Sequence, residues 1–326
     1  MEKNTSTYIP WEEQPKGDES PVWRYSKNPI IKRYPIRNIA RIFNSAVISY
    51  KNAFVGVFRA EQHDGVPFLY LGHSENGIDW QFEPDKIKVY DDNKKLVIYK
   101  YMYDPRLVTI EGVHYIIFCT DNHGATLGLI KTMDFKSFYA LSDPFLPFNR
   151  NGVLFPKKIN GNYVMLSRPS DSGHTPFGDI FISESPDLKY WGNHRFLMGK
   201  NNLWWQNIKI GGGSIPIETN EGWLIFYHGV TGTANGFVYS MGGAILDIDR
   251  PEVVKYRSRN WLLTPSEDYE EKGFVPNVIF PCSALYEKES GRIAIYYGAA
   301  DSYIGLAFTK VDKIISYIKN NADIQK

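Results

Sequence analysis

The feature that most restricts the fold is a repeat of paired hairpin patterns, which runs from about residue 38 almost to the C-terminus. Each pattern alternates β-branched or aromatic residues with polar ones across a tight turn, as in Phe68–Phe82 around Asn76-Gly77. Asn-Gly between such runs is a strong short-range signal for a β-hairpin. Five successive units are visible, and their leading hairpins end at these residues: Arg59, Thr120, Arg168, His228 and Gly298.

These ends lie 48 to 70 residues apart, which gives each unit room for four antiparallel strands. Five such units predict an all-β fold, a five-bladed β-propeller, in which radial closure protects the edges of every sheet. A β-sandwich is the main alternative, but it does not explain a paired-hairpin repeat along the whole chain. We therefore expect a single propeller domain over residues 1–326.

Both ends of the chain depart from the repeat. Residues 1–37 are rich in proline and charge, and we expect them to form an N-terminal arm that lies over the rest. Residues 311–326 carry apolar side chains at Ile314, Ile315 and Ile318 with polar residues between them. That spacing predicts a short amphipathic C-terminal helix on the rim of the propeller.

Composition excludes several classes of function. The net charge is +1, so nothing attracts the chain generally to nucleic acid or to an anionic membrane. No run approaches the roughly 20 apolar residues of a membrane span, and the polar N-terminus has no signal peptide, so we expect a cytoplasmic protein. The seven histidines show no metal-binding spacing, and we expect neither a metal nor a cofactor. Cys119 and Cys282 lie in apolar runs and are expected to be buried free thiols.

The propeller prediction gathers polar residues that are far apart in sequence. The innermost strands of a propeller surround a central channel, so residues at matching ends of successive inner hairpins converge on one mouth. The set so obtained contains acids, amides and an excess of cations: Asn44, Ser45, Arg59, Tyr103, Asp104, Arg150, Asn151, Arg168, Lys209, His228 and Asp301.

Asp104 is the candidate proton donor. It lies between Tyr103 and Pro105, and an aromatic setting that removes water from a carboxyl favours its neutral form. Asp-Pro is also a common turn opener, so a purely structural role stays open at this point. The same holds for the cations taken singly, because an arginine at a strand end is usually solvated or salt-bridged.

The gathered cations point to an anion. Positive groups that converge in a closed channel repel one another unless an anion joins them. Hydrolysis of a glycoside usually needs two carboxylates, whereas inorganic phosphate arrives as an ionised nucleophile and needs hydrogen-bond donors for its oxygens. One acid with a cluster of cations fits phosphorolysis better than hydrolysis, although Asp301 could serve as a second carboxylate.

Several motifs, in order along the chain, resemble those of glycoside hydrolase family 130. The similarity covers about residues 38–309, and its motifs are YMYDPR, NRNGVLFP, LSRPS, FYHG and YYGAAD, together with Arg59. The resemblance implies a five-bladed propeller enzyme, an inverting phosphorylase that cleaves a non-reducing β-1,4-linked mannose and releases α-mannose 1-phosphate. It implies β-1,4-mannooligosaccharides or mannosyl-β-1,4-N-acetylglucosamine as substrates, inorganic phosphate as co-substrate, and a homo-oligomer.

The resemblance also implies a role for each matching residue. Asp104 would be the general acid, donating through the 3-hydroxyl of the bound mannose. The phosphate would be bound by Arg150, Arg168, Lys209, His228 and Tyr239. The terminal mannose would be held by Asn44, Ser45, Arg59, Asn151 and Asp301, and the next sugar would be bordered by Tyr103 and His174. Tyr239 and His174 rest on the resemblance alone.

Two other functions stay open from the sequence. The first is a β-mannoside hydrolase on the same propeller, which would use Asp104 together with Asp301. The second is a sugar-binding propeller without catalytic activity. The preferred aglycone and the physiological direction of the reaction do not follow from the sequence, because the contacts that decide them lie in loops.

Overall fold

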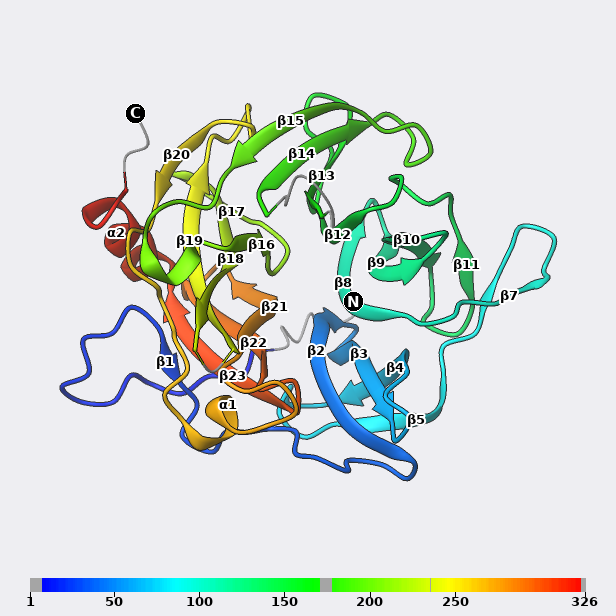
Figure 1. Ribbon diagram of the computed structural model, residues 1–326, viewed down its shortest axis with the longest axis horizontal. Helices are drawn as coiled ribbons and strands as arrows, with labels where there is room; N and C mark the ends of the chain where they lie inside the picture. The colour runs from blue at the N-terminus through cyan, green and yellow to red at the C-terminus, as the bar shows by residue number, and fades with distance from the viewer. Residues whose placement is uncertain (1–7, 171–177, 235, 324–326) are drawn as a thin grey trace, which may run out of the picture.

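The computed structural model describes residues 8–170, 178–234 and 236–323. Five sheets surround a central axis, from β2–β5 in blue to β21–β23 in orange and red (Figure 1). Each sheet contains a run of four antiparallel strands that leads outward from the axis. The predicted five-bladed β-propeller is therefore confirmed.

The first three blades follow the order of the chain. The strands of blade 1 are β2 (Ile39–Tyr50), β3 (Ala53–Gln62), β4 (Pro67–Ser74) and β5 (Gln81–Lys86). Those of blade 2 are β8 (Tyr103–Ile110), β9 (Val113–Asp121), β10 (Ala125–Thr132) and β11 (Phe138–Ala140), extended outward by β6 (Val89–Tyr90) and β7 (Leu96–Val97). Those of blade 3 are β12 (Asn149–Leu154), β13 (Tyr163–Pro169), β14 (Ile180–Ser185) and β15 (Gly192–Met198).

The last two blades complete the ring. The strands of blade 4 are β16 (Lys209–Gly212), β18 (Gly222–Thr233), β19 (Gly236–Leu246) and β20 (Val254–Arg257), with β17 (Ile217–Thr219) beside β18. Those of blade 5 are β21 (Ile279–Glu287), β22 (Arg292–Ala299), β23 (Tyr303–Lys310) and, outermost, β1 (Trp23–Arg24). The N-terminal arm thus supplies the outer strand of the last blade, which joins the two ends of the chain.

Among the described residues, five large hydrophobic clusters form a ring, one between each pair of neighbouring blades, and a small sixth cluster contains Val278, Phe280 and Cys282. Strand β3 shows why, because its alternate side chains leave opposite faces of the sheet. Phe54 and Phe58 pack towards blade 5, whereas Val55 and Val57 pack towards blade 2. Full burial of each such side chain contributes about 1.5–3 kcal/mol. The alternation that predicted the strands therefore also packs the blades together.

Helices are few and peripheral among the described residues. They comprise η1 (Trp204–Gln206), α1 (Asp268–Glu271) and the C-terminal α2 (Val311–Asn320). Helix α2 buries Ile314, Ile315 and Ile318 against the cluster between blades 4 and 5, so the predicted short C-terminal helix is confirmed. No helix in the described part of the chain is long and apolar enough to cross a membrane.

Candidate active site

Three inner strands carry an equivalent irregularity at the channel. The pairing register shifts between Phe43 and Ser45 in β2, between Tyr103 and Arg106 in β8, and between Arg150 and Val153 in β12. Such β-bulges re-aim a side chain.

Each bulge holds one residue in the left-handed region. Asn44 has φ 52°, Asp104 has φ 53° and Asn151 has φ 53°. Among residues other than glycine, Asn and Asp adopt this conformation most readily. The chemistry of an Asn or Asp side chain and the shape of the bulge therefore coincide on three successive blades.

The three bulges face a cavity of about 390 Å³ at the channel mouth. Most of the predicted site residues line it: Asn44, Arg59, Tyr103, Asp104, Arg150, Asn151, Arg168, Lys209, His228, Tyr239 and Asp301. Ser45 lies behind the wall, fully buried, and its hydroxyl has no partner among the described residues. The predicted His174 lies outside the described residues.

One side of the cavity, which we term the carboxylate half, consists of Asn44, Arg59, Asp104 and Asp301. Asp104 Oδ1 accepts hydrogen bonds from Asn44 Nδ2 at 2.7 Å and from Arg59 Nη1 at 2.9 Å. Within the described residues no side chain donates to Asp104 Oδ2, which leaves that oxygen for a ligand. A Cβ on Gly298 would lie 1.8 Å from Asn44 Oδ1, so a glycine is required there to admit the Asn44 side chain.

Asp301 enters the carboxylate half from the turn between β22 and β23. Ala300 and Asp301 have φ of 47° and 46°, the left-handed pair of a tight hairpin turn. Burial raises the pKa of Asp301 to about 6, the charge of Arg59 opposes that rise, and the charge of Asp104 adds to it. Asp301 is therefore neutral over part of the acidic range where an exposed aspartate is charged.

The opposite side, which we term the cation half, consists of Arg150, Arg168, Lys209 and His228. Arg150 Nη1 donates to the Tyr103 hydroxyl at 2.7 Å, and Arg168 Nη1 lies 3.0 Å from His228 Nε2. A Cβ on Gly211 would approach His228 Cε1 at 2.5 Å and Arg168 Nη1 at 2.9 Å, so this glycine makes room for the pair.

The protonation of His228 follows from its neighbours. An arginine donates only, so His228 Nε2 must accept and the imidazole proton lies on Nδ1. Burial lowers the pKa of His228 well below its ordinary value, and the charge of Arg168 lowers it further. His228 Nδ1 is buried without a partner among the described residues, so the neutral ring has one N–H group still to satisfy.

The charged forms of Lys209 and Arg168 are also disfavoured by their surroundings. Burial, followed by the charges of Arg168 and Arg150, lowers the pKa of Lys209 to about 8. Burial also lowers the pKa of Arg168. Among the described residues no carboxylate forms an ion pair with Arg150, Arg168 or Lys209. An anion in the cavity would supply the missing negative charge and raise these pKa values again.

Sequence reasoning missed the apolar part of the wall and the floor. The wall includes Cys119, Val275, Val278 and Phe280, which carry no chemical signature in the sequence. Beneath the cavity Arg106, 1% exposed, donates from Nη1 to Pro105 O at 3.0 Å and from Nη2 to Gly212 O at 3.3 Å, and so joins blades 2 and 4. The sequence signal that could have identified Arg106 is its position directly after the motif YMYDP.

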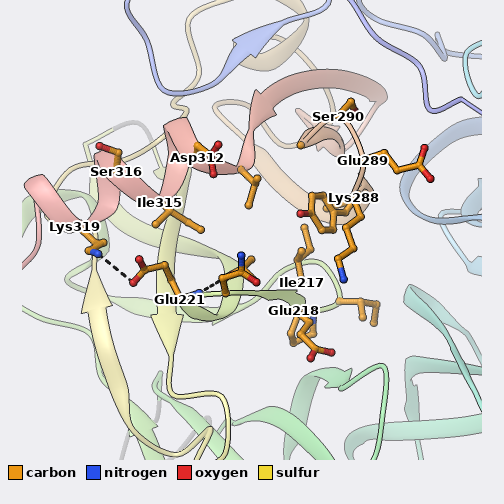
Figure 2. Close-up of a pocket in the computed structure, with 18 of the residues that line it drawn as sticks. Ile217, Glu218, Glu221, Lys288, Glu289, Ser290, Asp312, Ile315, Ser316 and Lys319 are labelled. Atoms are coloured by element: carbon orange, nitrogen blue, oxygen red, sulfur yellow. Dashed lines mark hydrogen bonds and ion pairs between the residues drawn. The ribbon is translucent and has the colours of Figure 1, made fainter.

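A larger cavity lies elsewhere and lacks this chemistry. It measures about 1,150 Å³ and opens between α2, the β17–β18 turn and the β21–β22 turn (Figure 2). Two of its charged residues, Glu221 and Lys319, pair with each other at 3.1 Å.

No group of three or more His, Cys, Asp or Glu residues able to hold a metal ion occurs within the described residues.

Known proteins share both the sequence and the fold. Residues 2–320 match the family model described as Glyco_hydro_130, beta-1,4-mannooligosaccharide phosphorylase. A beta-1,4-mannooligosaccharide phosphorylase of Ruminococcus albus is 50% identical over 97% of this chain and 96% of its own. A 1,2-beta-oligomannan phosphorylase of Thermoanaerobacter is 30% identical over 84% of this chain and 92% of its own.

A solved structure agrees with the fold of this chain. The complex of beta-1,2-mannobiose phosphorylase from Listeria innocua with beta-1,2-mannobiose superimposes with a TM-score of 0.80 at 26% identity. The alignment covers 92% of this chain and 99% of that one.

Proposed function

The chain belongs to glycoside hydrolase family 130, and from this membership and the geometry of the cavity we propose that it is an inverting β-mannoside phosphorylase. It would transfer the non-reducing terminal mannose of a β-1,4-mannoside to inorganic phosphate. The products would be α-D-mannose 1-phosphate and an acceptor that is shorter by one sugar.

The two halves of the cavity divide this reaction between them. A phosphate oxygen attacks the anomeric carbon, the bond from that carbon to the glycosidic oxygen breaks, and the leaving oxygen takes up a proton. Asp104 would supply that proton from the carboxylate half, with Oδ1 fixed by Asn44 and Arg59 and Oδ2 facing the sugar. Attack from the opposite face of the sugar inverts the configuration at the anomeric carbon.

The cation half would bind the phosphate. Arg150, Arg168 and Lys209 offer charged donors, and His228 offers its unpaired Nδ1–H. The hydroxyl of Tyr239, which also lines the cavity, would add a further contact. Binding would offset the repulsion that lowers the pKa of Lys209, so the site gains most from an anion with several oxygens.

The observation that carries the proposal is the absence of a carboxylate partner for these three cations within the described residues. A hydrolase needs a base to activate water, and a surplus of fixed positive charge does not help that step. Asp301 is the second carboxylate in the cavity, but it lies on the same side as Asp104 and is influenced directly by its charge. We therefore assign Asp301, with Asn44, Arg59 and Asn151, to the terminal mannose. Ser45, predicted with them, is fully buried and does not line the cavity, so it would act only through its neighbours.

We propose β-1,4-linked substrates because the relative from Ruminococcus albus, which is 50% identical to this chain, carries that linkage in its name. Mannose, N-acetylglucosamine or a longer mannan chain would occupy the acceptor side, next to Tyr103. Incubation with a panel of β-1,4-mannosides, followed by product analysis, would identify the preferred acceptor.

The decisive experiment compares cleavage with and without phosphate. We expect mannobiose to yield α-mannose 1-phosphate and mannose when phosphate is present, and almost no cleavage when it is absent. The variant Arg168→Gln should raise the KM for phosphate by about 10- to 100-fold, because a charge-assisted donor contributes about 1.5–3 kcal/mol. Equal release of mannose in both conditions would reject phosphorolysis and favour the hydrolase.

A further inference from the structure

We propose that Glu61, which does not line the cavity, is a positioning residue that holds Arg59 against the proton donor Asp104. This inference rests on the proposed function, because it concerns the donor of that reaction. Glu61 lies near the end of β3 and is 3% exposed. A buried carboxylate this close to an active site needs strong partners, and the identity of those partners carries the argument.

Each oxygen of Glu61 receives one guanidinium group. Oε1 accepts from Arg59 Nε at 3.2 Å and from Arg59 Nη2 at 2.6 Å. Oε2 accepts from Arg41 Nε at 3.1 Å and from Arg41 Nη2 at 2.7 Å. Nε and Nη2 of Arg59 are therefore held on Glu61, and its Nη1 reaches Asp104. The planar guanidinium transfers the orientation of Glu61 to the carboxyl of Asp104.

The same chain of contacts continues to the cavity wall. The Arg41 guanidinium lies 3.8 Å from the ring centroid of Phe274. Phe274 belongs to the segment between α1 and β21, which also supplies Val275 and Val278 to the cavity. Val275 N donates to Ala300 O, the residue before Asp301. Arg41 and Glu61 thus connect the donor to the segment that supplies Val275 and Val278 to the cavity wall.

The charge of Glu61 is as necessary as its shape. Without it, Arg41 and Arg59 would face each other with no anion between them, and Arg59 would be free to turn towards Asp301. The charges of Arg59, Asp104, Glu61 and Arg41 all act on Asp301, and that of Glu61 raises its pKa. Replacing Glu61 by a neutral group should therefore lower the pKa of Asp301 as well as loosen Asp104.

The test is Glu61→Gln, which keeps the shape and removes the charge. We expect kcat for release of the acceptor from mannobiose to fall by about 10- to 100-fold, while phosphate binding measured by calorimetry changes less than threefold. In a double-mutant cycle with Arg59→Lys the two losses should be far from additive, because both act through one contact.

The matched control is Glu184→Gln. Glu184 also accepts from an arginine, Arg195 Nη2 at 2.5 Å, but it pairs strands β14 and β15 away from the cavity. We expect its kcat to stay within twofold of the wild-type value. If Glu61→Gln does not fold, Arg41→Gln makes the same test from the other end of the contact, with an expected loss of about 3- to 10-fold.

Two results would overturn the positioning role: a folded Glu61→Gln enzyme with kcat within twofold of wild type, or an equal loss in kcat and phosphate affinity. Failure of the proposed function is separate from both. It would appear in the wild-type enzyme as cleavage that does not need phosphate, and the effect of Glu61→Gln on that cleavage rate would still be measured.

Discussion

The carboxylate half and the cation half of the cavity treat buried charge in opposite ways. In the carboxylate half, Arg59 binds Asp104, and behind the cavity Glu61 binds both Arg59 and Arg41. In the cation half, the described residues provide no carboxylate for Arg150, Arg168 or Lys209. Asp104 therefore has a charged partner within the protein, whereas the three cations would gain one from a bound anion.

This difference teaches which reactant each half serves. A site that must present a proton in a fixed direction benefits from internal partners, since they hold the donor before substrate arrives. A site that must capture an anion benefits from unpaired cations, since internal partners would compete with the ligand. Substitutions in the carboxylate half should therefore change kcat or the KM for the mannoside, and those in the cation half should change the affinity for phosphate.

The largest expected effect comes from Asp104→Asn. The amide preserves the shape of the side chain but cannot donate the required proton, so kcat should fall by about 10²- to 10⁴-fold. Phosphate affinity, which the opposite half provides, should change less than threefold. Steady-state kinetics on mannobiose together with phosphate calorimetry would check both values. A variant that retains its rate would show that Asp104 is not the proton donor of the reaction.

A smaller effect should follow from the pKa of Lys209, which is about 8 in the empty site. Below that pH Lys209 is cationic and attracts phosphate, whereas above it phosphate must bind beside a neutral amine or bring a proton with it. The KM for phosphate should therefore rise about 5- to 10-fold between pH 7.5 and pH 9. Initial rates at varied phosphate concentration would measure this rise.

The control for Lys209 is Lys209→Arg, because a guanidinium remains charged over the whole range. Both enzymes experience the same ionisation of phosphate itself, so the ratio of their KM values isolates the titration of Lys209. That ratio should change with pH. A ratio that is constant from pH 7.5 to pH 9 would mean that Lys209 stays protonated or does not contact the anion.

The fold could be predicted because its signal is repeated. Alternating apolar runs across tight turns, two of them Asn76-Gly77 and Asn160-Gly161, mark the same unit five times, and one weak unit does not hide the pattern. The outer strand β1 could not be predicted in the same way, because two residues, Trp23 and Arg24, carry no periodicity. Their pairing with β23 depends on the closed ring, which is a tertiary constraint.

The site divides along similar lines. Residues at equivalent ends of inner strands, such as Asp104 and Arg168, could be gathered once the propeller was assumed. The bulges that aim Asn44 and Asn151 could not, because their register shifts depend on neighbouring strands. Glu61 was missed for another reason. It does not line the cavity and contacts it only through Arg59, so its role becomes visible only from its ion pairs with Arg59 and Arg41.

The smallest expected effect is a gain in stability from Asp301→Asn. The pKa of Asp301 is raised to about 6 in the folded protein, so the folded state holds a proton that the unfolded chain has already lost. The free energy of unfolding therefore falls as the pH rises from about 4 to about 6, because the buried carboxyl must ionise, and it stays at the lower value above that range. Removing the charge should therefore increase the free energy of unfolding by about 1–2 kcal/mol at pH 7.5, and by about a third as much at pH 4.5.

Thermal melting of wild type and Asp301→Asn at the two pH values would measure this difference, and activity would measure what the charge is for. If Asp301 holds the terminal mannose, the more stable variant should be the weaker enzyme, with a higher KM for mannobiose and an unchanged affinity for phosphate. If Asp301→Asn instead lowered the melting temperature equally at both pH values, the charge of the Asp301 carboxylate would not destabilise the fold. The carboxylate half would then differ from the cation half more sharply still, because every one of its charges would be compensated within the protein.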